Sequence, residues 1–249
     1  MKILAIGNSF STDATVYLHD IAAADKVDLT VVNLFIGGCS LETHWCNIIS
    51  DAPAYLYELN GQETRMISIK EALQEANWDY VTMQQYSGLS GVQESYYPYI
   101  TDISNYAKLL APSATQLIHQ TWAYDNGCQH EDFPRYGNNQ QTMYLALKRA
   151  YEAVANDLKL DIIPCGDIVQ AVRSHPVFDY ANGGQSLCRD GYHMHFVYGR
   201  FLTAAAWYEK LTKHSILTNN YLPPSNGDTI IDQEKIKIIK QHVHSIISQ

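Results

Sequence analysis

The sequence is poor in cysteine, in basic residues and in long apolar runs. Its five cysteines are an odd number without a Cys-x-x-Cys pair, so it does not predict a disulfide framework. No apolar run reaches membrane-spanning length. With 17 basic against 26 acidic residues, the formal net charge is -9. This charge argues against nucleic acids and anionic membranes as partners, and its simplest role is solubility.

The chain is long enough for one α/β domain with a large core. Its 249 residues are 46% hydrophobic and 17% charged, as in an ordinary globular protein. No repeat, low-complexity segment or linker divides it, so we expect a single domain over residues 1–249. The first expected strand begins at Lys2 without a preceding signal-like segment, so the sequence as written predicts a cytoplasmic protein. A secreted or periplasmic protein whose signal peptide had been replaced by Met1 would have the same sequence.

Apolar runs and helical periodicity alternate along the chain. They predict strands at residues 2–6, 29–36, 79–84, 116–122 and 161–164. They predict helices at residues 14–24, 41–49, 69–76, 99–110, 138–158, 167–173, 198–211 and 231–247. Asn60-Gly61 is a hairpin signal within residues 54–69, which we interpret as a small surface insertion. The alternation predicts a parallel sheet with helices on both faces.

Polar and glycine residues follow several of the expected strands. Ser9, Gly38, Gln85 and Trp122 all fall at or just after the carboxyl end of a strand. In open α/β sheets these ends meet in one crevice, which is where ligands bind. We therefore expect the loops 87–97 and 124–136, after the third and fourth strands, to wall the site.

Two short motifs supply the chemistry. Gly7-Asn8-Ser9 puts a serine at a tight strand-to-helix turn, and Asp190 and His193 lie three residues apart before a helical stretch. A serine hydroxyl is a poor nucleophile until a base removes its proton. His193 is the candidate base, and Asp190 is the candidate for fixing its tautomer. Alone, Ser9 and Asp190 would read as helix caps and His193 as a surface residue.

Attack on an ester also creates an oxyanion, which needs preorganised donors. The backbone N–H of Ser9 is free at a helix start, and Gly38 offers another N–H without a side chain to block a substrate. The side-chain amide of Gln84 or Gln85 is a candidate third donor.

These residues resemble the blocks of the SGNH (GDSL-like) hydrolases, which are esterases and lipases. Gly7-Asn8-Ser9 matches their first block, Gly37-Gly38-Cys39-Ser40 their second, and Asp190 to His193 their last. The resemblance spans nearly the whole chain. It implies a flavodoxin-like three-layer α/β/α sandwich with a central, mostly parallel five-stranded sheet. It also implies a triad of Ser9, His193 and Asp190, with Gly38 as the oxyanion glycine.

Two positions depart from the family pattern. Asn8 replaces the usual aspartate, a mild change because both side chains can hold the turn. The third block normally has Gly-x-Asn, but residues 83–88 contain no asparagine. Strand alternation does not choose between Gln84 and Gln85 where the strand is ending. Gln85 is our expected substitute, because it is closer to the crevice. Together with residues 119–122, this indicates a divergent bacterial subgroup.

The expected loops are rich in side chains that could contact a substrate. The candidates are His44, Gln84, Tyr86, Trp122 and Tyr124. Aromatic faces can stack on a sugar ring, whereas the simpler interpretation is that they pack on the core. His44 is otherwise a solvated helix position. His193 and His195 could chelate a metal, but no acidic or cysteine partner has suitable spacing, so no metal site is predicted.

The sequence thus predicts a serine hydrolase that needs no cofactor. It would cleave carboxylic esters through an acyl-serine, and its substrate would be a small molecule or glycan carrying short acyl (acetyl) groups. Two alternatives stay open. One is a flavodoxin-like module that binds a phosphate or nucleotide at the turn of residues 8–12. The other is an inactive relative with a misaligned triad, which only binds glycans.

Overall fold

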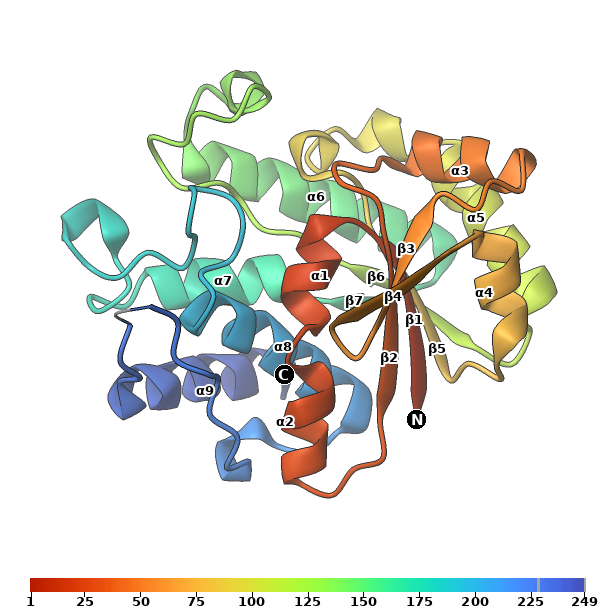
Figure 1. The fold of residues 1–249 in the computed structure, drawn as a ribbon. Coiled ribbons are helices and arrows are strands. Elements are labelled where there is room, and N and C mark those ends of the chain that lie inside the picture. Colours follow the sequence, from red (N-terminus) through yellow and green to blue (C-terminus); the bar gives the residue numbers. More distant parts are fainter. Residues whose placement is uncertain (228, 249) are drawn as a thin grey trace.

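The computed structural model describes residues 1–227 and 229–248, which form a three-layer α/β/α sandwich around a seven-stranded sheet (Figure 1). The strand order is β4-β3-β2-β1-β5-β6-β7. The parallel strands are β1 (Lys2–Gly7), β2 (Thr30–Phe35), β5 (Tyr80–Met83), β6 (Thr115–His119) and β7 (Asp161–Ile163). They correspond to the five strands predicted from the sequence. β1 lies at the centre with Ile3 to Ile6 fully buried, as its continuous apolar run indicates.

The other two strands correct the predicted count of five. β3 (Tyr55–Leu59) and β4 (Gln62–Ile67) form the hairpin predicted at residues 54–69, with Asn60 and Gly61 at positive φ in its turn. The hairpin is not a surface insertion, because β3 pairs antiparallel with β2 and extends the sheet. Tyr55 and Tyr57 are both buried. Because successive side chains of a strand point to opposite faces of the sheet, Tyr55 and Tyr57 lie on the same face.

Helices cover both faces of the sheet, and Figure 1 shows the two groups on opposite sides. One group packs together around α8: α1 (Ser9–Thr15), α2 (Leu18–Ala24), α7 (Cys165–Arg173), α8 (Tyr198–Thr212) and α9 (Gln233–Ile247). The other group is α3 (Leu41–Ile49), α4 (Ile69–Glu75) and α5 (Tyr99–Leu110). α6 (Gln140–Leu158) contacts β7 and α7. Short 3-10 helices occupy residues 87–89, 93–96, 133–136, 180–182 and 216–218.

Two predicted boundaries differ from the structure by three residues or more. The helix predicted at residues 14–24 begins earlier, at Ser9, because the Asn8 side chain caps it, and it is divided into α1 and α2. The strand predicted at residues 116–122 ends at His119. Its neighbour β7 ends at Ile163, so the ladder has no partner for further residues. Trp122 therefore lies in the loop after β6.

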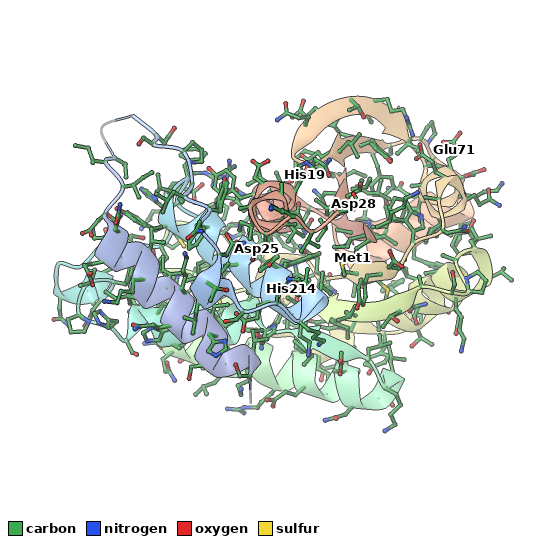
Figure 2. The ribbon with its side chains drawn as sticks, turned by 90° about the horizontal axis from the view of Figure 1, so that it is seen from below. Met1, His19, Asp25, Asp28, Glu71 and His214 are labelled. Atoms are coloured by element: carbon green, nitrogen blue, oxygen red, sulfur yellow. The ribbon has the colours of Figure 1, made fainter. Side chains whose placement is uncertain are left out.

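The parallel strands have the flavodoxin-like order, with β1 between β2 and β5. The chain leaves β1 toward one face and β5 toward the other, so their carboxyl ends flank the switch point where such folds bind ligands. Ser9 follows β1 at this point. The opposite end is seen in Figure 2, where Met1 and Asp28 are joined by a 2.8 Å hydrogen bond from the α-amino group to the Asp28 carbonyl.

Candidate active site

The turn after β1 is closed by a capping box. The Asn8 Oδ1 accepts the Phe10 N–H at 3.0 Å, and the Ser11 hydroxyl oxygen accepts the Asn8 N–H at 3.0 Å. A Cβ on Gly7 would lie 2.1 Å from the Ser11 Oγ, so only glycine fits there. Capping satisfies N–H groups that a helix start leaves unpaired. The motif thereby fixes Ser9 as the first residue of α1.

The structure brings together the three side chains that the sequence analysis predicted to interact. The Ser9 Oγ lies 2.9 Å from the His193 Nε2, and the His193 Nδ1 lies 2.7 Å from the Asp190 Oδ2. A carboxylate can only accept, so Nδ1 carries the proton and Nε2 is left to accept the Ser9 hydroxyl proton. This is the order of contacts that a serine nucleophile, its base and an orienting acid require.

Asp190 is held ionised by its own loop. Its Oδ1 accepts the backbone N–H groups of His193 at 2.7 Å and Tyr192 at 3.2 Å. Partial burial raises the pKa of Asp190, but the hydrogen bonds from the His193 side chain and from these N–H groups outweigh it, so the pKa is lower than usual. A carboxylate in this state stabilises an imidazolium as it forms.

An aromatic stack supports the loop that carries His193. The Trp122 Nε1 donates to the Tyr192 carbonyl at 2.7 Å, and the Trp122 ring stacks on Phe10 with centroids 4.4 Å apart. Phe10 in turn lies 5.9 Å from the His193 ring. Trp122 is fully buried. It therefore positions the motif, and the prediction that it contacts substrate is corrected.

Asp13 links the nucleophile helix to the histidine loop. Its carboxylate is buried, and it accepts the Met194 N–H at 2.8 Å, Arg189 at 3.0 Å and the Arg200 Nε at 2.8 Å. Arg189 also donates to the Met194 carbonyl. Sequence reasoning missed this contact. The signal available was an aspartate four residues after Ser9, on the same helix face, with arginines flanking the Asp190–His193 motif.

The backbone N–H groups of Ser9 and Gly38 have no hydrogen-bond partner within residues 1–227 and 229–248. The two turns are joined, because the Asn8 Nδ2 donates to the Cys39 carbonyl at 3.0 Å. Gly38 has a φ of +63°, and a Cβ there would meet the Tyr86 ring at 3.8 Å. Neither N–H group is used in a hydrogen bond among the described residues.

Gln85 does not have the role predicted for it. Its Nε2 donates to the Ser95 carbonyl at 2.9 Å and to the Ser95 hydroxyl at 3.1 Å. Its Oε1 accepts the N–H groups of Leu41 at 3.0 Å and Tyr86 at 2.8 Å. The side chain is 1% exposed. Because its amide is used within the protein, Gln85 braces the loops after β2 and β5 and is not free to face an oxyanion.

Gln84 is likewise an internal brace. Its Nε2 donates to the Asn8 Oδ1 at 2.7 Å, and its Oε1 accepts the His119 Nδ1–H at 2.6 Å. Gln84 is 1% exposed, so the prediction that it binds substrate is corrected. Burial lowers the pKa of His119 to about 3, which keeps this imidazole neutral. The three side chains connect the ends of β1, β5 and β6.

Two further substrate-binding candidates are also buried. The Tyr124 hydroxyl bonds to Ser87 at 2.7 Å, and the His44 Nδ1 lies 2.9 Å from the Tyr55 hydroxyl. Burial lowers the pKa of His44 to about 3. Neither side chain is exposed enough to contact a substrate, and His44 is not a solvated helix position. Tyr86 is half-buried, and it alone of the predicted aromatic contacts is partly exposed.

The loop over residues 124–136 borders the triad. His130 packs edge-on against Tyr192 with ring centroids 4.9 Å apart, and Tyr192 lies 4.3 Å from the His193 ring. A cavity of about 390 Å³ here is lined by Gln129, His130, Glu131, Asp190 and Tyr192. Sequence reasoning did not assign His130 to the site; its proximity to Tyr192 depends on how the two loops fold together.

The described residues contain no cluster of three or more side chains suited to a metal ion. Among the helices in residues 1–227 and 229–248, none is long and apolar enough to cross a membrane.

Comparison with known proteins places this architecture among the SGNH/GDSL hydrolases. A candidate SGNH hydrolase from Slackia heliotrinireducens superposes with a TM-score of 0.57 at 22% identity, covering 84% of this chain and 97% of that one. A catalytic mutant of an acetylxylan esterase from Geobacillus stearothermophilus superposes with a TM-score of 0.53 at 13% identity, covering 83% and 91%. At these identities the likeness shows the fold.

The family assignment is more specific. The model of DUF4886, described as a domain of unknown function, matches residues 2–240, and the chain belongs to this family. The crystal structure of a DUF4886 family protein from Bacteroides uniformis has a TM-score of 0.91 at 37% identity, covering 100% of this chain and 95% of that one. The curated proteins contain no match. The chain is thus a DUF4886 family protein whose fold is that of the SGNH/GDSL hydrolases.

Proposed function

We propose that the protein is a serine ester hydrolase of the SGNH type. The observation that carries this proposal is the continuous chain of contacts from the Ser9 Oγ through His193 to Asp190, at 2.9 and 2.7 Å. A phosphate-binding turn would not require an acid and an imidazole beside its serine. The short distances also favour a hydrolase over an inactive relative with a misaligned triad.

The proposed reaction has two halves. His193 takes the Ser9 proton as the Oγ attacks the ester carbonyl, and the resulting oxyanion accepts hydrogen bonds from the N–H groups of Ser9 and Gly38. The ester bond breaks as His193 returns the proton to the departing alcohol. Water then attacks the acyl-serine, with His193 again removing and returning one proton, and the carboxylic acid leaves. These steps balance without a cofactor.

A short acyl group fits the surroundings of Gly38. The Tyr86 ring lies 3.8 Å from the position that a Cβ on Gly38 would take. The Tyr86 hydroxyl donates to Asp132 at 2.8 Å, which holds the ring in place. An acyl chain beside this oxyanion glycine therefore has little lateral room, which favours acetyl. Structural neighbours described as acetyl xylan esterases support an acetylated carbohydrate as the substrate class.

The proposal is tested with aryl esters of graded acyl length and with acetylated oligosaccharides. We expect turnover of acetate esters, with rates falling as the acyl chain lengthens. In a Tyr86→Ala variant, the preference for acetyl should weaken while acetate turnover persists. If no activated ester is hydrolysed and the protein instead binds a flavin or nucleotide tightly, the hydrolase proposal fails.

A further inference from the structure

A groove extends from Asp190 and Tyr192 along one side of the protein. Beside the cavity of about 390 Å³ next to Tyr192 lies one of about 490 Å³, and then one of about 370 Å³. The first two cavities share Asp190, and the last two share Asp125 and Tyr180. Because adjoining cavities have lining residues in common, we treat them as one feature, the side groove. It runs between the loops over residues 124–132 and 178–191.

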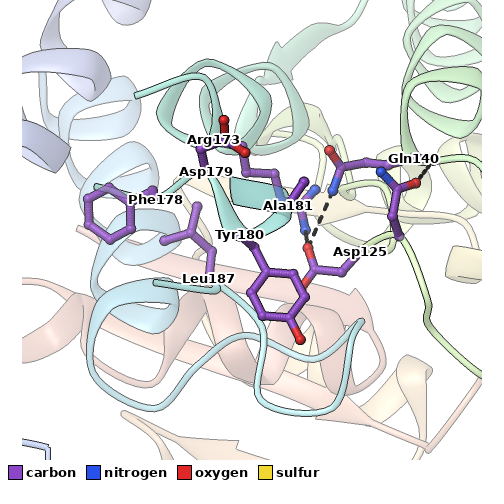
Figure 3. A pocket seen from close by; sticks show the side chains of 9 residues that line it. Asp125, Gln140, Arg173, Phe178, Asp179, Tyr180, Ala181 and Leu187 are labelled. Carbon is purple, nitrogen blue, oxygen red and sulfur yellow. Dashed lines mark hydrogen bonds and ion pairs between the residues drawn. The ribbon is translucent and has the colours of Figure 1, made fainter. Parts of the chain in front are cut away.

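The far end of the side groove has an incompletely paired cation at its base (Figure 3). Arg173 is 6% exposed, and it donates to the Asp125 Oδ1 at 2.7 Å and to the Ala123 carbonyl at 2.8 Å. Its Nε has no hydrogen-bond partner within residues 1–227 and 229–248. A buried N–H without an acceptor is costly. Arg173 lines the cavity, but the Nε itself is buried in the protein.

The walls of this far cavity combine an aromatic face with hydrogen-bonding groups. Tyr180 is 55% exposed, and its ring lies near Leu187 and Asp125 in Figure 3. Asn126 and Gln140 bring side-chain amides to the same cavity. An exposed ring suits the C–H face of a sugar, and amides and carboxylates suit its hydroxyls.

The charge of the side groove favours a neutral ligand. The cations that line it, Arg173 and Arg189, are already paired with Asp125 and Asp13. The other charged lining residues are acidic: Glu131, Asp179 and Asp190. A polyanion would meet this negative excess without an unpaired cation to offset it.

We propose that the side groove binds the alcohol portion of the substrate as an extended, neutral oligosaccharide, with the cavity at Tyr180 and Arg173 as a remote sugar subsite. This inference rests on the proposed function, since it gives the ester a glycan leaving group. Sugar units beyond the acetylated one add contacts along the groove, so longer substrates are bound and cleaved more efficiently.

The test is chain-length dependence. kcat/KM is measured for an aryl acetate and for acetylated neutral oligosaccharides of increasing length. We expect kcat/KM to rise with length, and Tyr180→Ala to lower it about five- to thirtyfold for the longest substrate while aryl acetate turnover is unchanged. Tyr180→Phe keeps the ring and should keep the length dependence. Leu109→Ala, at a residue 73% exposed on α5, is the matched control and should change neither.

Other outcomes separate the two proposals. Aryl acetate turnover without any dependence on oligosaccharide length would overturn the proposed role of the side groove, whereas the esterase proposal would still hold. A preference for uronic-acid oligomers over neutral ones would also overturn it. If no ester is cleaved, calorimetry with unmodified neutral oligosaccharides decides: binding that Tyr180→Ala abolishes supports the groove, and no binding refutes it.

Discussion

The turns after β1 and β5 lie together at the carboxyl edge of the sheet, yet they use their polar groups in opposite ways. After β1, the Ser9 hydroxyl meets the His193 imidazole, and the Ser9 N–H has no partner among the described residues. After β5, the amides of Gln84 and Gln85 are occupied by the protein's own groups.

The comparison shows that a polar residue at the right place in the topology is not enough for a site. Buried polar groups are almost always hydrogen-bonded, and one whose bonds are all made internally has none to offer a reaction. The β1 turn is therefore expected to control rate, and the β5 turn to control stability. Substitutions in each turn can break or sharpen this distinction.

The largest effect is expected at Ser9. Ser9→Ala removes the attacking oxygen and should lower ester turnover by about a thousandfold or more, with folding intact. His193→Ala should be nearly as damaging, and Asp190→Asn less so. Turnover by the purified variants is compared with that of Ser50→Ala, an exposed serine at the end of α3. A fully active Ser9→Ala protein would remove the catalytic role of the β1 turn.

Substitution of Asp13 should lower both the catalytic rate and the stability, because Asp13 joins α1 to the histidine loop. Asp13→Asn leaves Arg189 and Arg200 without their charge partner, and breaking such a buried pair costs about 3–5 kcal/mol. We also expect kcat to fall about ten- to a hundredfold with KM little changed, since His193 is less well placed.

The control for Asp13 is Glu209→Gln. Glu209 is a buried carboxylate that accepts the Ile216 N–H at 2.9 Å, far from Ser9 in sequence and outside the site. Denaturant unfolding should show a loss of stability in both variants, and kinetics should show a loss of kcat only in Asp13→Asn. Equal kcat values would reduce Asp13 to a purely structural residue.

Substitutions in the β5 turn should lower the stability of the protein without changing its catalytic rate. Gln84→Ala and Gln85→Ala each leave buried partners unpaired, at a cost of about 1–3 kcal/mol. We expect kcat of the folded variants to change less than about threefold. If Gln85→Ala instead lowered kcat tenfold or more at unchanged stability, its amide would be an oxyanion donor after all and the comparison of the two turns would collapse.

The smallest effect concerns acid stability, through His119 behind Gln84. Burial lowers the pKa of His119 to about 3 in the folded protein, against about 6.5 when unfolded. Its contribution is therefore complete above about pH 6.5 and is lost as pH falls toward 3, by about 2 kcal/mol between pH 6.5 and 5.

Replacing this imidazole should flatten the pH dependence. In His119→Gln the difference in unfolding free energy between pH 7 and pH 5 should shrink by about 2 kcal/mol, as measured in urea. His214→Gln, an exposed histidine labelled in Figure 2, is the control and should leave the difference unchanged. The same difference in His119→Gln as in the wild type would show that the ring is not held neutral.

Local patterns in the sequence predicted much of the fold. The parallel strands, the helices α3 and α5 and the Asn60-Gly61 hairpin follow from apolar periodicity and turn chemistry, which act over a few residues. The pairing of β3 with β2 was missed because pairing joins segments that no local pattern connects. The end of β6 at His119 was predicted wrongly for the same reason, since it depends on where the neighbouring strand β7 ends.

The sequence by itself determined which residues can do chemistry here: a serine at a glycine-asparagine turn, and an acid and a histidine spaced to bond within one loop. Local geometry specifies these contacts. Only the tertiary structure decided that Gln85, Trp122 and Tyr124 are buried supports, that Asp13 ties the two motifs together, and that His130 and Tyr180 border a groove. Those roles depend on which hydrogen-bonding groups and which surfaces remain free after distant segments have packed, and that is a property of the folded chain.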